Sequence, residues 1–136
     1  GDMLDLAPWG SYAKPREVRY TTQPSLVELH WWLGQLRLVA PSATILYIEG
    51  NHEFRISRSI LESLSEAEGV RPADDPGGHD AISIPRLLAL DSLDIEYIGP
   101  YGEGFWLWDT VRFHHGTLAR KGGGSTVAAM LKEATH

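Results

Sequence analysis

The sequence predicts an α/β fold in which helices pack against buried strands. Apolar residues recur at helical spacing in segments 26–39, 54–67 and 125–133. Segment 43–48 is instead a continuous run of apolar residues, rich in β-branched and aromatic types, as in a strand buried on both faces. Because helices and strands alternate, we expect a layered architecture. The chain has 136 residues, 43% of them hydrophobic, which suits a single domain spanning 1–136.

The first elements follow from prolines, glycines and helical spacing. Residues 6–24 contain three prolines and a glycine, and are predicted to form an irregular loop. Ser25 and Glu28 have the spacing of a capping box, which predicts that the first helix begins there. Its apolar residues are expected on one face, and Pro41 is expected to end it.

The later elements are assigned in the same way. A helix is expected from Phe54 to about Ala67. Most of the tryptophans, Trp32, Trp106 and Trp108 among them, are expected in the core. The remaining elements are a loop at 69–80, a helix at 83–93, strands at 95–98, 105–108 and 111–114, a small-residue loop at 122–124 and a helix at 125–133.

Composition excludes several classes of function. The formal net charge of −6 argues against a broad basic face for duplex nucleic acid. It would also repel a phosphorylated substrate unless a local cation intervenes. Without cysteine there can be no disulfide, no thiolate zinc site and no cysteine nucleophile, which fits a cytoplasmic location. A membrane partner is not expected, because no apolar stretch approaches the length of a membrane span.

The strongest local motif is Gly50-Asn51-His52-Glu53, directly after the predicted strand at 43–48. Glycine allows a sharp turn, and the asparagine amide oxygen is a ligand for hard or borderline cations. Histidine can ligate a metal or donate a proton, and glutamate can orient the imidazole ring. The alternative is a turn followed by an Asn-capped helix with an exposed histidine, and the motif alone leaves both interpretations open.

Two weaker motifs accompany it. His114 and His115 precede Gly116 at the end of a predicted strand, where neighbouring side chains point to opposite faces. Only one of them can therefore face a site beside the first motif, and a structural role is the alternative. Asp2 and Asp5 near the start could form a turn or a cap, although a carboxylate can also bridge two cations.

Taken together and in this order, the three motifs resemble those of the calcineurin-like metallophosphoesterase superfamily, especially bacterial and phage-type members. The resemblance covers Gly1 to Gly116. It implies a layered α-β-β-α sandwich, two divalent metal ions and hydrolysis of phosphomonoesters or phosphodiesters. The family's Asp-x-His and Gly-His-x-His motifs do not occur here, so we expect an internal fragment, incomplete at both ends and weak or inactive alone.

The resemblance also implies roles for individual residues. Asp2 would bridge the two metal ions, and Asn51 and His115 would ligate the second one. His52 would lie near the leaving-group oxygen, as a general acid or as a stabiliser of the transition state.

Three more residues would support this centre. Asp5 and Glu53 would hold loops and the His52 ring, and Arg55 would contact phosphate or help to hold the site. A surface arginine is the alternative for Arg55. Oxygen and nitrogen ligands suit Mn, Fe, Zn or Ni without choosing among them.

The expected substrate is a phosphorylated small molecule or a nucleotide, with nucleic acid not favoured. Two other functions stay open. One is a non-enzymatic binding or scaffold module on the same fold, and the other is a DNA or RNA nuclease of the same superfamily.

Overall fold

The computed structural model describes residues 1–118 and 125–134, and it confirms a mixed α/β chain. The predicted loop at 122–124 lies outside the described residues. The helices are α1 (Thr22–Val39), α2 (Phe54–Ser63), α3 (Ile84–Leu87) and α4 (Ser125–Ala134), with short 3-10 helices at Ala7–Trp9, Arg16–Tyr20, Ser65–Ala67 and Leu90–Leu93. The strands are β1 (Ile45–Ile48), β2 (Ile95–Ile98), β3 (Gly104–Leu107) and β4 (Val111–His114).

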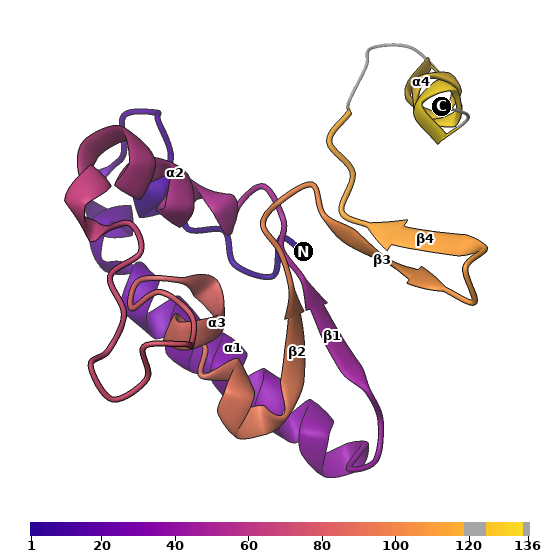
Figure 1. The fold of residues 1–136 in the computed structure, drawn as a ribbon. Helices are drawn as coiled ribbons and strands as arrows, with labels where there is room; N and C mark the ends of the chain where they lie inside the picture. The colour runs from indigo at the N-terminus through magenta and orange to yellow at the C-terminus, as the bar shows by residue number, and fades with distance from the viewer. Residues whose placement is uncertain (119–124, 135–136) are drawn as a thin grey trace.

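The strands of the described residues form two separate pairs (Figure 1). β1 and β2 are parallel, with Ile45 opposite Ile95, whereas β3 and β4 form an antiparallel hairpin. Parallel strands bring their carboxyl ends to one edge of the sheet, where open α/β folds commonly place their sites. Figure 1 shows the amino terminus beside that edge.

The core lies where α1 and α2 meet the parallel pair and the turns before β2. From α1 it takes Leu26, Leu29 and Leu33, whose three- and four-residue spacing places them on one helical face. The other core residues are Leu4, Leu6, Tyr47, Ile56, Ile60, Ile84, Leu88, Leu90 and Ile95.

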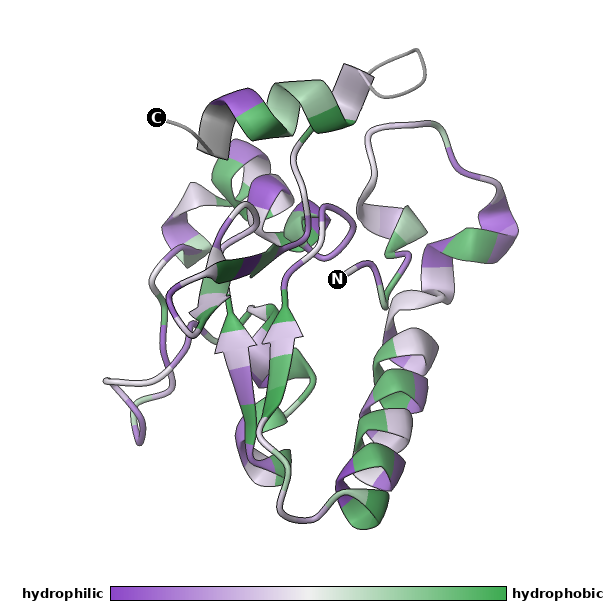
Figure 2. Ribbon diagram, turned by 90° about the vertical axis from the view of Figure 1, so that its right-hand side faces the viewer, coloured by the Kyte–Doolittle hydropathy of each residue, from purple (hydrophilic) through white to green (hydrophobic). Residues whose placement is uncertain are grey.

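The buried stripe of α1 is narrower than predicted. Trp32 and Val39 were expected to face the core but are 57% and 80% exposed. A sheet of two strands covers only a narrow strip of a helix, which leaves apolar side chains uncovered. Figure 2 accordingly shows hydrophobic residues along the whole length of α1. Within residues 1–118 and 125–134, no helix combines the length and apolar character needed to cross a membrane.

The predicted start of α1 at Ser25 is wrong, because the helix begins at Thr22. Pro24 is tolerated there, since an N–H in the first helical turn has no intrahelical acceptor. Trp9 fixes this end of the helix by donating its indole N–H to Thr22 Oγ1 at 3.0 Å. The loop at 6–24 is also more ordered than predicted, because it contains two 3-10 helices.

The predicted helix at 83–93 is divided in two. α3 ends at Leu87, and Ala89 then adopts a left-handed backbone with a φ of +49° before the 3-10 helix Leu90–Leu93. A left-handed residue cannot continue a right-handed helix. The helical spacing of apolar residues therefore extends to Leu93, although α3 itself ends at Leu87.

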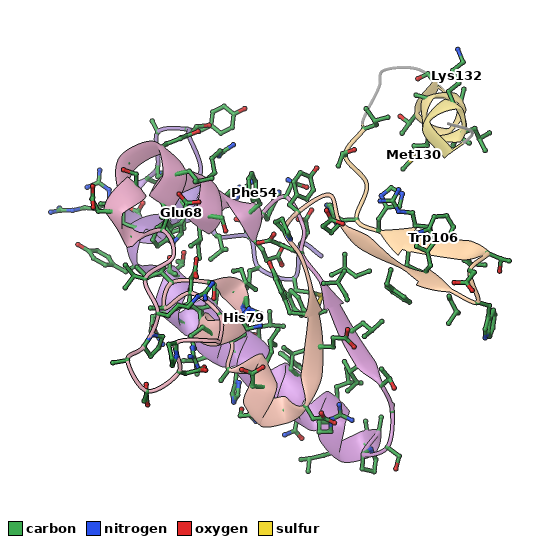
Figure 3. The ribbon with its side chains drawn as sticks, viewed as in Figure 1. Phe54, Glu68, His79, Trp106, Met130 and Lys132 are labelled. Atoms are coloured by element: carbon green, nitrogen blue, oxygen red, sulfur yellow. The ribbon has the colours of Figure 1, made fainter. Side chains whose placement is uncertain are left out.

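The prediction that β1 is buried on both faces is also wrong. Only Tyr47 is buried, and the other three residues of the strand are half-buried. Trp106 is 59% exposed and Trp108 is 80% exposed, contrary to their expected place in the core. Figure 3 shows Trp106 on the β3–β4 hairpin, which projects away from the parallel pair.

Candidate metal centre

The amino-terminal Gly1-Asp2 segment touches the Gly50–Glu53 motif through the two glycines, at the carboxyl edge of the parallel pair. A Cβ atom on Gly50 would lie 2.3 Å from the Asp2 amide nitrogen, and one on Gly1 would lie 2.7 Å from the Gly50 Cα. Such distances are far below van der Waals contact, so both positions require glycine. This close approach brings Asp2 against the turn that carries Asn51.

Donor atoms from all three motifs converge at this point. His115 Nε2 lies 2.9 Å from Asn51 Oδ1 and 3.3 Å from Asp2 Oδ2. Two ligand atoms that share a transition-metal ion at about 2.1 Å lie roughly 3.0–3.4 Å from each other in tetrahedral or octahedral geometry. The spacing around His115 therefore fits donors of a single ion, and the two oxygens and one nitrogen suit a borderline cation.

The backbone holds Asp2 in a defined orientation. Its φ of +57° is left-handed, a conformation that aspartate tolerates better than most residues. Asp2 Oδ1 accepts the backbone N–H of His52 at 3.0 Å, and Oδ2 faces His115. The side chains of Asp2 and His115 are 33% and 18% exposed, so the donor atoms can be reached from solvent.

Glu53 anchors the amino-terminal segment. Its buried carboxylate accepts hydrogen bonds at 2.8–3.2 Å from the backbone N–H groups of Asp2, Met3, Leu4 and Gly50 and from the Tyr47 hydroxyl. Burial, followed by the charge of Glu53, raises the pKa of Tyr47 far above its ordinary value, so the hydroxyl remains a donor. The sequence predicted that Glu53 holds loops and orients His52. In the structure Glu53 holds the loops but does not contact the His52 ring, because its side chain points inward beneath the turn at Gly50.

The His52 ring is held by Asp5 instead. His52 Nδ1 lies 3.0 Å from Asp5 Oδ1, and the same oxygen lies 3.2 Å from Arg55 Nη1. Arg55 Nη1 also donates to the Asp5 carbonyl oxygen. The Arg55 side chain is only 22% exposed and ties α2 to the amino-terminal segment, so it is more than a surface arginine.

Two residues that the sequence did not single out support His115. The Tyr101 ring lies against the His115 ring, with centroids 5.8 Å apart, and against Phe54 at 5.7 Å. Its backbone N–H donates to the buried Glu49 Oε2 at 2.5 Å. Burial raises the pKa of Glu49, and the bond from Tyr101 opposes this shift. No sequence spacing links these two residues, because the contact forms only when β1 and β2 pair.

A pocket of about 340 Å³ opens beside Asn51. Arg55 and Arg58 line it from α2, together with Tyr12 and Tyr101. Figure 3 shows Phe54, which also lines the pocket, at the start of α2 above the ends of the parallel strands. The sequence spacing predicts that Arg55 and Arg58 lie together, because residues three apart share one face of a helix.

The three converging donor atoms would suffice for one ion, and both metal ions stay predictions. Within 1–118 and 125–134, no three His, Cys, Asp or Glu side chains form a cluster able to hold a metal, because the third donor here is an amide. His30 contacts the Leu88 carbonyl oxygen through Nδ1 at 2.7 Å and lies away from this group, and His79 is an exposed loop residue.

Comparison of the chain with family models, curated proteins and solved structures finds no match. The family resemblance therefore depends on the three motifs and on the way the fold brings them together.

Replacing Gly50 by alanine is expected to lower the free energy of unfolding by about 2–4 kcal/mol, because the added methyl group overlaps Asp2 and forces apart two packed segments. Gly34→Ala in α1 is the matched control. Its methyl group would meet only Leu93 Cδ2, at 3.9 Å, and alanine favours the helix by about 0.5–1 kcal/mol. Urea unfolding of both variants measures the difference. Equal stabilities would contradict the close approach of Gly50 to Asp2.

Proposed function

We propose that this chain carries the metal site of a metallophosphoesterase of the calcineurin-like superfamily, which hydrolyses phosphomonoesters or phosphodiesters. On this proposal the β1–β2 pair belongs to the layered α-β-β-α sandwich of that superfamily. The observation that carries the proposal is the convergence of Asp2, Asn51 and His115 from three separate motifs.

The surroundings of these donors support phosphate chemistry. His52 is adjacent to Asn51 in the chain, and the pocket beside Asn51 has two arginines in its wall. Guanidinium groups pair well with phosphate oxygens. A bound cation would also offset the net charge of −6 locally, which removes the electrostatic objection to an anionic substrate.

The protein's own residues supply binding and a proton. When bound, divalent cations act as Lewis acids that polarise the phosphoryl group and make a water nucleophilic near neutral pH. Asn51 and Arg55 are suited to orient the phosphate. Asp5 engages His52 Nδ1, so the proton that passes to the departing oxygen leaves from Nε2. His52 then remains as the neutral tautomer with its proton on Nδ1, facing Asp5.

Replacing His52 by alanine is expected to lower kcat for phenyl phosphate, whose leaving oxygen is strongly basic, by about 10²- to 10⁴-fold, the usual contribution of a positioned acid. The assay compares the full-length gene product in the presence of Mn²⁺ with the same protein after treatment with a chelator. Mn²⁺ affinity should change little, because His52 is not among the three donors. His79→Ala, in an exposed loop, is the control and should keep full activity. Undiminished hydrolysis by the His52 variant would sink its proposed role.

A non-enzymatic metal-binding module is the second candidate, and one observation favours it. The converging atoms of Asp2, Asn51 and His115 would suffice for one ion, whereas two-metal hydrolysis needs two. Tight binding of a single Mn²⁺ without hydrolysis of any phosphoester by the full-length gene product would support this alternative.

A further inference from the structure

We propose that the pocket beside Asn51 holds the leaving group of the substrate, and that Arg58 selects leaving groups bearing a second negative charge, such as a carboxylate or a further phosphate. This inference rests on the proposed function, because it assumes that the scissile phosphate lies at Asn51. It adds a determinant of specificity that the three motifs do not contain.

The position of the pocket supports this assignment. Asn51 contributes both to the pocket wall and to the converging donors, since its Oδ1 lies 2.9 Å from His115 Nε2. A phosphate bound at the donors would therefore have its ester substituent at the mouth of the pocket. The volume of about 340 Å³ suits a group the size of a substituted ring.

The two arginines of the pocket differ in how firmly they are held. Arg55 is tied to the carbonyl and carboxylate of Asp5, which fixes it in the pocket wall that it shares with Asn51 and leaves it little freedom to follow the leaving group. Arg58 is 41% exposed and pairs with Glu62 at 3.9 Å, a long contact that contributes little at the surface. Arg58 can therefore turn to an anionic ligand at low cost.

The aromatic residues of the pocket suit the apolar part of such a leaving group. Tyr101 is held by Phe54 and His115, which gives the pocket one rigid wall. Tyr12 also lines the pocket, and its side chain is 86% exposed. Because the ring is not packed into the core, it can pack against a bound ligand.

Another cavity of the described residues, about 480 Å³ in volume, does not compete for this role. It lies where β1 and β2 begin, at the end of the sheet opposite to Asn51. Its cation, Arg37, is occupied by the backbone carbonyls of Leu93, Ala43 and neighbouring residues. That arginine closes the turn after α1, which is a structural task.

The test compares phenyl phosphate with meta-carboxyphenyl phosphate as substrates of the full-length gene product. We expect kcat/KM to favour the carboxylated ester about fivefold, the effect of one partly exposed ion pair. Arg58→Gln should remove the preference, and Arg58→Lys should keep part of it. Arg19→Gln is the control of equal charge change, because Arg19 is an exposed residue that does not line the pocket. Loss of the preference in this control would overturn the assignment.

A binding measurement separates this proposal from the proposed function. Benzylphosphonate and its meta-carboxylated form cannot be hydrolysed, and calorimetry gives their affinities without activity. The carboxylated form should bind about fivefold more tightly to the wild type and equally to Arg58→Gln. If neither ester is hydrolysed but this difference is found, the hydrolase proposal fails and the pocket stands. Equal affinities in the wild type, or no binding of the carboxylated form, overturn the pocket.

Discussion

Replacing Glu53 by alanine is expected to lower the free energy of unfolding by about 3–5 kcal/mol, the largest effect on stability among the residues of the site. The carboxylate is fully buried and accepts five hydrogen bonds, four of them from backbone N–H groups. Without it, several buried donors lose their acceptor, at about 1–3 kcal/mol each. Denaturant unfolding measures the loss, provided that the m-value is unchanged.

Glu53→Gln is a sharper test than the alanine variant. The amide nitrogen would replace one oxygen, and both oxygens face at least two donors, so the new N–H groups would point at other N–H groups. We therefore expect glutamine to cost nearly as much as alanine. The control is Glu62→Gln, a 67% exposed carboxylate whose loss should stay within about 0.5 kcal/mol. A Glu53→Gln variant as stable as the wild type would contradict the hydrogen-bond network.

The site is also expected to lose its shape in these variants. Glu53 connects the turn carrying Asn51 to the segment carrying Asp2, so its removal should release the Met3 and Leu4 amides to solvent. Native-state hydrogen exchange should show faster exchange at these two amides than at the core of α1. The amino-terminal segment that carries Asp2 and the turn that carries Asn51 thus depend on one buried side chain.

The sequence predicts those features of the fold that depend on local pattern. The spacing of Leu26, Leu29 and Leu33 identified the buried face of α1, and the apolar runs identified the strands. The burial of those elements could not be predicted in this way. It depends on how many strands share the sheet, and with two strands Trp32 and much of β1 stay partly exposed.

In the candidate site, too, the sequence predicted some features and missed others. The sequence identified Asp2, Asn51 and His115 because each belongs to a short motif, and the fold brings them together. It assigned the support of the His52 ring to Asp5 and Glu53 alike, whereas the structure separates their tasks. Glu53 follows His52 directly, but its side chain points inward to the backbone of residues 2–4. Asp5, from the amino-terminal segment, reaches the ring instead.

The tertiary contacts of Tyr101 had no sequence signal at all. It follows β2, some 50 residues after the Gly50 turn, and its backbone N–H reaches Glu49, the residue after β1, only because β1 and β2 pair in parallel. Contacts of this kind depend on register between distant strands, which a single sequence does not encode in any local pattern.

The second large effect is expected on metal affinity. His115→Ala should weaken Mn²⁺ or Zn²⁺ binding by about 10²-fold or more, because it removes the nitrogen that lies between Asp2 Oδ2 and Asn51 Oδ1. His114→Ala is a closely matched control, since it deletes the same side chain one position earlier, at the end of β4. It should leave affinity within about twofold, because His114 is the last residue of β4 and is not among the converging donors.

Calorimetry with each metal alone gives the affinities, and thermal unfolding gives an independent readout. A metal present at 100 times the wild-type dissociation constant stabilises the native state by about 2.7 kcal/mol, which should raise the Tm of the wild type and of His114→Ala. A site weakened 10²-fold gains only about 0.4 kcal/mol, so the Tm of His115→Ala should hardly change. This shift needs no catalytic activity, so it tests the metal site apart from the hydrolase proposal. If the two histidine variants bind metal equally well, the convergence of Asp2, Asn51 and His115 is a hydrogen-bonded contact between loops and not a metal site, and the proposed function loses the observation that carries it.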